Sequence, residues 1–153
     1  NAGLALQGQL LRKIGVDVDD ISFGGAAGGA RADMTTPRVT VQLLRLIASR
    51  PYYKAFRRAL PILGVDGTLF QIATDSPARG KVQAKTGTYY VYNAMNKRRR
   101  LTSKALGGYM TAKSGRHLAF SIVVNNVHLD DHVATSTIGQ DLGAISATIQ
   151  QAY

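Results

Sequence analysis

Residues 82–88 read VQAKTGT, and they mark the point where the sequence changes from helical spacing to the period of strands. Two more strand-like stretches follow, residues 106–112 (LGGYMTA) and residues 117–124 (HLAFSIVV), and the segment 113–116 (KSGR) between them predicts a turn. We expect these last two strands to form a hairpin. Because residues 117–124 are mostly apolar, we expect them to form a central strand.

Helical patterns lie on both sides of these strands. The apolar spacing predicts helices over residues 3–14, from Pro37 to before Pro51, over 52–60 and over about 134–153. Thr36 is a suitable N-cap for the second of these, with Pro37 at its first position. The sequence therefore predicts an α+β fold, an antiparallel sheet of about three strands packed with helices.

The composition limits the class of protein. The chain has 153 residues, of which 45% are hydrophobic, so it can bury a core and is not wholly disordered. It has no Cys, which excludes a disulfide framework and a thiolate nucleophile. No apolar run approaches the roughly 20 residues that cross a bilayer. With 19 Lys plus Arg against 9 Asp plus Glu, the net charge is +10, which first suggests nucleic acid or an acidic surface as partner.

The Lys-Thr-Gly of residues 84–88 (AKTGT) resembles one of three motifs of penicillin-interacting serine enzymes, the others being Ser-x-x-Lys and Ser-x-Asn. The resemblance implies that Lys85 supplies fixed positive charge beside the nucleophile and the substrate carboxylate. It implies that Thr86 and Thr88 bind that carboxylate, while Gly87 leaves room for a ligand along the strand edge. Taken alone, the tripeptide also fits an ordinary edge strand with a solubilising lysine.

The order of the surrounding segments makes the resemblance specific. Residues 59–69 (ALPILGVDGTL) precede residues 75–87 (DSPARGKVQAKTG), and residues 106–109 (LGGY) and 113–116 (KSGR) follow. This order resembles the D-alanyl-D-alanine carboxypeptidase/endopeptidase family, the class C low-molecular-mass penicillin-binding proteins. The match runs from about residue 23 to residue 126, and it implies that the chain has part of a penicillin-binding/β-lactamase-like transpeptidase fold.

One departure from the family pattern concerns a glycine-rich segment. Residues 23–28 (FGGAAG) and 35–37 (TTP) resemble the family segment that reads DGSG followed by TPR. This chain has Gly24 where the family usually has Asp. The departure puts in doubt any role of that carboxylate, including a hydrogen bond that rigidifies the loop.

The other two motifs are not complete in this sequence. No Lys has a Ser three positions before it, and none of the four later Asn residues has a Ser two positions before it. Only Asn1 remains, and Asn1-Ala2-Gly3 fits the end of the family variant Ser-x-Asn-x-Gly. We therefore expect residues 1–153 to be the C-terminal part of a penicillin-binding transpeptidase-like domain, without the N-terminal part that carries Ser-x-x-Lys.

The family resemblance assigns roles to these residues. It implies that Lys85 and Asn1 are catalytic, that Thr86, Gly87 and Thr88 bind substrate, and that the Thr88 N–H lines the oxyanion hole. The expected partners are a peptidoglycan stem peptide or a β-lactam, and the missing N-terminal part of the same enzyme. The resemblance implies no cofactor, metal or nucleic acid, and a place outside the cytoplasmic membrane, in the periplasm or cell-wall space. Without its nucleophilic serine, the chain alone should be inactive.

Other interpretations remain open at this point. Residues 96–100 (NKRRR) could contact phosphates, with the tyrosines of residues 89–92 as stacking residues, which would make the chain a non-catalytic basic module that binds nucleic acid or an anionic polymer. The same residues also fit a solvated hairpin loop. Residues 128–132 (HLDDH) could hold a metal, or they could simply connect the last strand to the last helix. Finally, the chain could serve only as a structural half, completed by an absent N-terminal segment.

Overall fold

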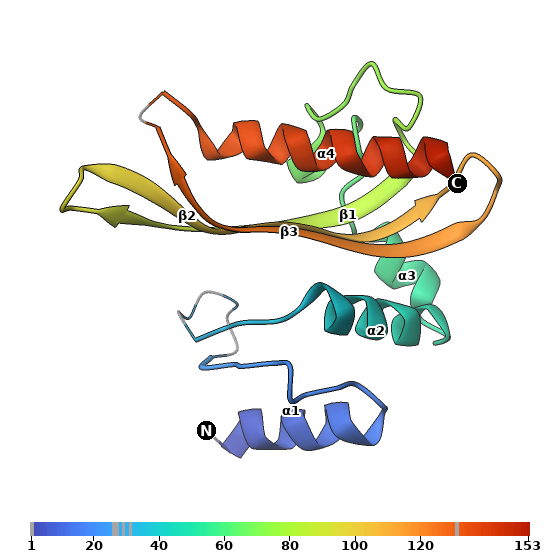
Figure 1. Ribbon diagram of the computed structural model, residues 1–153. Coiled ribbons are helices and arrows are strands. Elements are labelled where there is room, and N and C mark those ends of the chain that lie inside the picture. The colour runs from blue at the N-terminus through green and yellow to red at the C-terminus, as the bar shows by residue number, and fades with distance from the viewer. Residues whose placement is uncertain (1, 26–27, 29, 31, 131) are drawn as a thin grey trace.

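The computed structural model describes residues 2–25, 28, 30, 32–130 and 132–153, and it shows a three-stranded antiparallel sheet between helices (Figure 1). The elements are α1 (Ala2–Lys13), α2 (Pro37–Ala48), α3 (Tyr53–Arg58), the short 3₁₀ helix η1 (Gly67–Leu69), β1 (Val82–Asn93), β2 (Arg98–Thr111), β3 (His117–Leu129) and α4 (Thr135–Ala152). The strand order is β1-β2-β3. The α+β prediction is confirmed, as are the predicted hairpin of β2 and β3 and the helices at both ends of the described chain.

Helices cover both faces of the sheet, α4 on one side and α2 on the other (Figure 1). The main core lies on the α4 side, since alternate residues of each strand point there. Its buried members include Leu63, Leu69, Val82, Ala84, Leu106, Met110, Phe120 and Leu142. The sheet thus positions one set of side chains in a closed apolar layer and the alternate set toward α2.

A buried tyrosine joins α2 to the sheet, beside the buried apolar residues Val39 and Leu44 of that helix. The Tyr109 hydroxyl donates a hydrogen bond of 2.7 Å to the carbonyl of Leu44 in α2. Its ring meets those of Tyr53 and Phe56 edge to face, at centroid distances of 5.1 and 6.4 Å. At its start, α2 has the expected cap, because the Thr36 side chain accepts a hydrogen bond from the Val39 N–H. One tyrosine therefore ties α2 and α3 to the sheet.

One glycine allows the strands β1 and β2 to approach each other. Gly108 lies opposite Ala84, and a Cβ on Gly108 would stand 2.2 Å from the carbonyl oxygen of Gln83. No side chain can occupy that space without moving a strand. The position of β1, and of the Lys-Thr-Gly segment on it, depends on this glycine.

The prediction that residues 117–124 form the central strand is wrong, because β2 lies between β1 and β3. The apolar sequence of β3 has another cause: α2 packs on one of its faces, and Phe120 and Ile122 reach the core under α4 on the other. A strand covered on both faces reads as a continuous apolar run whether or not it is central.

The strands are also longer than predicted. β1 continues through the tyrosine-rich segment to Asn93, and β2 already begins at Arg98, so only residues 94–97 form the turn. The pairing shifts between Tyr89 and Tyr90, which marks a β-bulge. We call residues 89–101 the hairpin arm; in Figure 1 it extends beyond the ends of α2 and α4.

Helix α1 has no buried residue, as is also true of the short helix α3. Its Leu6 and Leu10 are 65% and 57% exposed. Among the helices that the structure describes, none combines the length and the apolar character needed to cross a membrane.

Candidate active site

The Lys-Thr-Gly segment lies on β1 where the outer edge of the strand becomes free. At the start of β1 that edge is covered, since the Ala84 N–H donates to Pro61 and the Val82 carbonyl accepts from Leu63. In the described part of the chain, no backbone group pairs with this edge beyond Ala84. Because backbone groups alternate along an antiparallel strand, the N–H groups of Thr86 and Thr88 point outward like that of Ala84.

The predicted side chains are gathered on this open stretch. Lys85 is exposed, and its Nζ donates a hydrogen bond of 2.8 Å to the Thr86 carbonyl. The Thr86 hydroxyl donates to Thr68 Oγ1 of η1 at 3.1 Å. Gly87 and Thr88 are exposed. The structure therefore brings Lys85, Thr86, Gly87 and Thr88 to one accessible edge, whereas Asn1 lies outside the described residues.

The two ends of this segment present their side chains to different faces of the sheet. Lys85 pairs with Gly107, and a Cβ on Gly107 would point at Thr40 of α2. Thr88 pairs with Lys104, whose side chain lies against Gly139 of α4. Lys85 is thus on the α2 face, and Thr88 is on the α4 face.

Lys104 is a neighbour of this edge that sequence reasoning missed. It is only 8% exposed, and its Nζ donates a hydrogen bond of 2.8 Å to Thr88 Oγ1. Burial lowers the Lys104 pKa from its ordinary value of 10.5, because the charged ammonium loses water. Nothing in the local sequence SKA distinguishes this lysine from a surface residue. Only the register of β1 against β2 reveals its place.

The glycine-rich segment is held by a carboxylate from its far end. Asp33 accepts hydrogen bonds from the N–H groups of Gly24, Gly25 and Ala30, at 2.9, 3.2 and 3.1 Å. The family Asp that Gly24 replaces is therefore not needed to fix the described part of this loop. Asp33, which sequence reasoning did not single out, supplies those hydrogen bonds.

The hairpin arm carries the densest positive charge. Residues 97–100 are all cationic, and Arg98 lies 3.7 Å from the carboxylate of Asp130. Tyr90 and Tyr92 are 53% and 62% exposed, whereas Tyr89, the tyrosine nearest Thr88, is half-buried. In the described residues, no three His or Asp side chains gather in a way that could hold a metal ion. Asp131, part of the possible metal segment, lies outside those residues.

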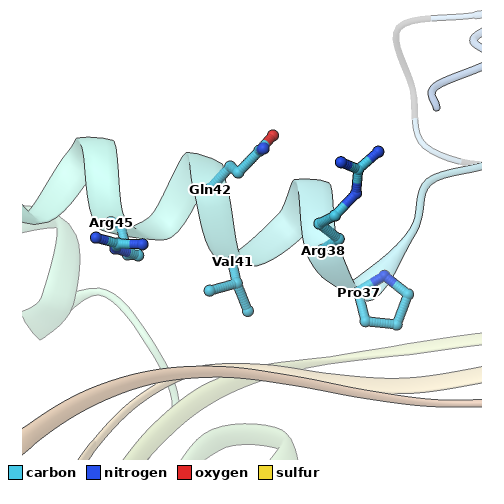
Figure 2. A pocket seen from close by; sticks show the side chains of 5 residues that line it. All are labelled: Pro37, Arg38, Val41, Gln42 and Arg45. Atoms are coloured by element: carbon cyan, nitrogen blue, oxygen red, sulfur yellow. The ribbon is translucent and has the colours of Figure 1, made fainter. Parts of the chain in front are cut away.

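A hollow of about 450 Å³ lies along α2, lined by Pro37, Arg38, Val41, Gln42 and Arg45 (Figure 2). Arg38 forms ion pairs with Asp17 and Asp20. The guanidinium between these two carboxylates has its pKa raised above the ordinary value. The hollow contains no predicted site residue, so the candidate site is the open edge of β1 and not this hollow.

Known proteins resemble this chain in sequence and in fold. Residues 1–148 match the D-Ala-D-Ala carboxypeptidase 3 (S13) family. A D-alanyl-D-alanine carboxypeptidase from Actinomadura sp. (strain R39) is 33% identical over 133 residues, which cover 84% of this chain and 22% of that protein. This chain therefore spans about a fifth of the length of that relative.

Solved structures show the same fold at lower identity. Penicillin-binding protein 4 (dacB) from Haemophilus influenzae superposes with a TM-score of 0.74 at 22% identity, covering 97% of this chain and 32% of that one. The same protein complexed with a β-lactam gives a TM-score of 0.72 at 21% identity, covering 94% and 32%. An extended-spectrum β-lactamase superposes with a TM-score of 0.63 at 18% identity, covering 92% of this chain and 53% of that one. The fold is thus that of penicillin-binding proteins and β-lactamases.

Proposed function

The chain belongs to the D-Ala-D-Ala carboxypeptidase 3 (S13) family, and we propose that it is the C-terminal part of a serine-type D-Ala-D-Ala carboxypeptidase or endopeptidase. Its substrates are peptidoglycan stem peptides, and β-lactams bind at the same place. Residues 1–153 belong to a single transpeptidase-like domain, which acts outside the cytoplasmic membrane. The proposal assigns the nucleophilic serine to the part of the domain that precedes this chain.

The observation that carries the proposal is the open edge of β1 at Lys85–Thr88. Two outward N–H groups and the Thr88 hydroxyl can donate hydrogen bonds there to an extended peptide and its terminal carboxylate, and the Thr86 hydroxyl can do so by exchanging its hydrogen bond to Thr68 for one to the ligand. In this proposal, Thr86 and Thr88 bind the carboxylate, and the Thr88 N–H stabilises the oxyanion. The Lys85 ammonium adds positive charge on the α2 face, beside the place of the nucleophile. Asn1 completes the Ser-x-Asn motif.

Labelling by a fluorescent penicillin tests this function. The protein that includes the upstream motifs should form a covalent adduct, and the 153-residue chain alone should not, because it lacks the serine. Lys85→Ala should reduce the rate of labelling by at least about a hundredfold, since charge stabilisation at the reacting centre is lost. Lys81→Ala is the matched control: Lys81 is also exposed, but it precedes the open edge.

Two results would contradict the proposal. Equal labelling of the Lys85→Ala and Lys81→Ala proteins would remove the assigned role of Lys85. A stable penicilloyl adduct on the isolated chain would show that the nucleophile is not where the family resemblance puts it.

The hairpin arm supports a second candidate function, the binding of an anionic polymer such as nucleic acid. Residues 97–100 provide four adjacent cations, and Tyr90 and Tyr92 offer exposed rings beside them. This function needs no nucleophile, and so the two candidates are distinguished by different measurements.

A further inference from the structure

We propose that Lys104 is a second cation of the carboxylate site. It acts as a positioning residue, because it orients the Thr88 hydroxyl to donate a hydrogen bond to the substrate carboxylate. The inference rests on the proposed function, in which Thr88 binds the terminal carboxylate of a stem peptide. It adds a residue from β2 that the Lys-Thr-Gly motif does not contain.

The Lys104 charge has no carboxylate partner in the described residues. The ion pairs that the structure describes do not include Lys104. Its neighbours on the three adjoining elements are Thr88 of β1, Val124 of β3 and Gly139 of α4, and none of them is acidic. A buried ammonium without a counter-ion destabilises a fold. An anion at the exposed Thr88 would supply that counter-ion.

The hydrogen bond between Lys104 and Thr88 has a fixed direction. A lysine ammonium can only donate, so the oxygen of Thr88 must accept from Lys104. The hydroxyl hydrogen of Thr88 is then free to point elsewhere, and Thr88 is exposed at the outer edge of β1. Lys104 thereby selects the rotation of the hydroxyl in which it donates to a ligand on that edge.

Helix α4 holds Lys104 in place. A Cβ on Gly139 would lie 3.3 Å from Lys104 Cε, so the helix backbone packs directly against the lysine stem. The ammonium therefore approaches Thr88 from the α4 face, while Lys85 lies on the α2 face. A carboxylate bound at the edge of β1 would experience positive charge from both faces of the sheet.

Nuclear magnetic resonance of the full chain, with lysine side chains labelled, tests the inference directly. The probes are N-acetyl-D-Ala-D-Ala and its C-terminal amide, which differ only in the carboxylate. The acid should raise the Lys104 pKa toward its ordinary range, because it provides the missing counter-ion, and the amide should not. Identical Lys104 titrations with the two probes would overturn the proposal.

Variants separate positioning from a purely structural role. Lys104→Met should reduce the preference for the acid over the amide about tenfold or more, as expected for loss of a charge-assisted interaction. Thr88→Val should reduce that preference while keeping the lysine. Lys113→Met, the same change at an exposed lysine in the β2–β3 turn, should preserve it. An unchanged preference in folded Lys104→Met protein would overturn the proposal, and if that variant fails to fold, the wild-type titration decides.

The experiment also separates this inference from the proposed function. If the longer protein is labelled by penicillin but Lys104 does not respond to the acid, the inference fails and the function stands. If Lys104 responds to the acid but no penicillin adduct forms, the carboxylate site stands and the proposed peptidase function fails.

Discussion

The two faces of the sheet bury polar groups in opposite ways. On the α2 face, Tyr109 is neutral, and its hydroxyl is satisfied by the Leu44 carbonyl. On the α4 face, Lys104 brings a cation under a helix and is hydrogen-bonded to Thr88. The first arrangement stabilises the fold at no electrostatic cost, whereas the second places a charge where only part of it is compensated.

The difference suggests which face serves structure and which serves ligand binding. A hydrogen bond whose two partners are both buried joins two elements, and neither group requires a ligand to satisfy it. A buried cation whose acceptor is the exposed Thr88 still has electrostatic attraction to offer a ligand. The free energy of unfolding and its dependence on pH should therefore differ between variants of the two faces.

The largest loss of stability should come from changing Gly108, the glycine that lets β1 and β2 approach each other. Gly108→Ala should lower the free energy of unfolding by about 3 kcal/mol, because the added methyl would stand 2.2 Å from the Gln83 carbonyl. Gly107→Ala is the control, since its Cβ would make an ordinary contact of 3.5 Å with Thr40. Urea denaturation measures both. Equal losses would mean that the close approach of β1 and β2 does not control stability.

A smaller loss is expected on the α2 face. Tyr109→Phe should lower the free energy of unfolding by about 2 kcal/mol, because the buried carbonyl of Leu44 loses its donor. Tyr53→Phe removes a hydroxyl from the neighbouring ring and is the control. If the two variants are equally stable, the hydroxyl of Tyr109 does not tie α2 to the sheet.

The same tyrosine should make the free energy of unfolding depend on pH in the alkaline range. Burial raises the Tyr109 pKa to about 12, while the unfolded chain should titrate near the ordinary value of 10.0. Between these values the unfolded state loses the proton first, so this group makes stability fall as pH rises. The fall should be smaller in Tyr109→Phe than in wild type, as measured by denaturation at several pH values. An unchanged fall would show that Tyr109 is not its source.

The sequence could point to the candidate site residue on one face of the sheet and not to the one proposed on the other. Lys85 was found because the motif AKTGT is contiguous and its chemistry is recognisable from residue types alone. Lys104 is 16 residues from its hydrogen-bond partner. No local sequence pattern shows that Lys104 pairs with Thr88 or that Gly139 of α4 lies against it. Asp33 was missed for the same reason, because its three hydrogen bonds depend on how the loop closes.

Prediction of the fold was limited in the same way, because some of its features depend on contacts that are distant in the sequence. Helix and strand types followed from spacing, since each depends on neighbours in sequence. The position of β3 did not, because an apolar strand is produced equally by a central place or by helices on both faces. The length of β1 also escaped prediction, since Tyr90 and Tyr92 are exposed and their strand continues by pairing with β2.

On the α4 face, the contribution of Lys104 to stability should change with pH in the direction opposite to that of Tyr109. Lys104 has its pKa lowered by burial, so between that value and 10.5 the unfolded state binds more protons than the folded state. This group therefore makes stability rise with pH in that window. Lys104→Met should raise the free energy of unfolding at neutral pH by about 1 kcal/mol and remove the rise. A loss of stability at neutral pH would show that the lysine is retained for packing, which contradicts the contrast between the faces.

The smallest effect on stability is expected in the hairpin arm, which lies beyond the helices of both faces. Arg99→Gln combined with Arg100→Gln should leave the melting temperature unchanged, because both side chains are exposed.

If the arm binds nucleic acid, the wild-type chain should shift a DNA fragment at low salt. The paired substitution should then reduce the slope of the logarithm of the binding constant against the logarithm of the salt concentration by about 0.9 for each phosphate that the arm no longer neutralises. Lys113→Gln with Arg116→Gln removes the same charge from the turn at the other end of the sheet, so an equal change there would indicate general attraction to a chain of net charge +10. No shift at low salt would remove the binding module as a function, and the arm would then be an extension of the strand that carries Lys85 and Thr88.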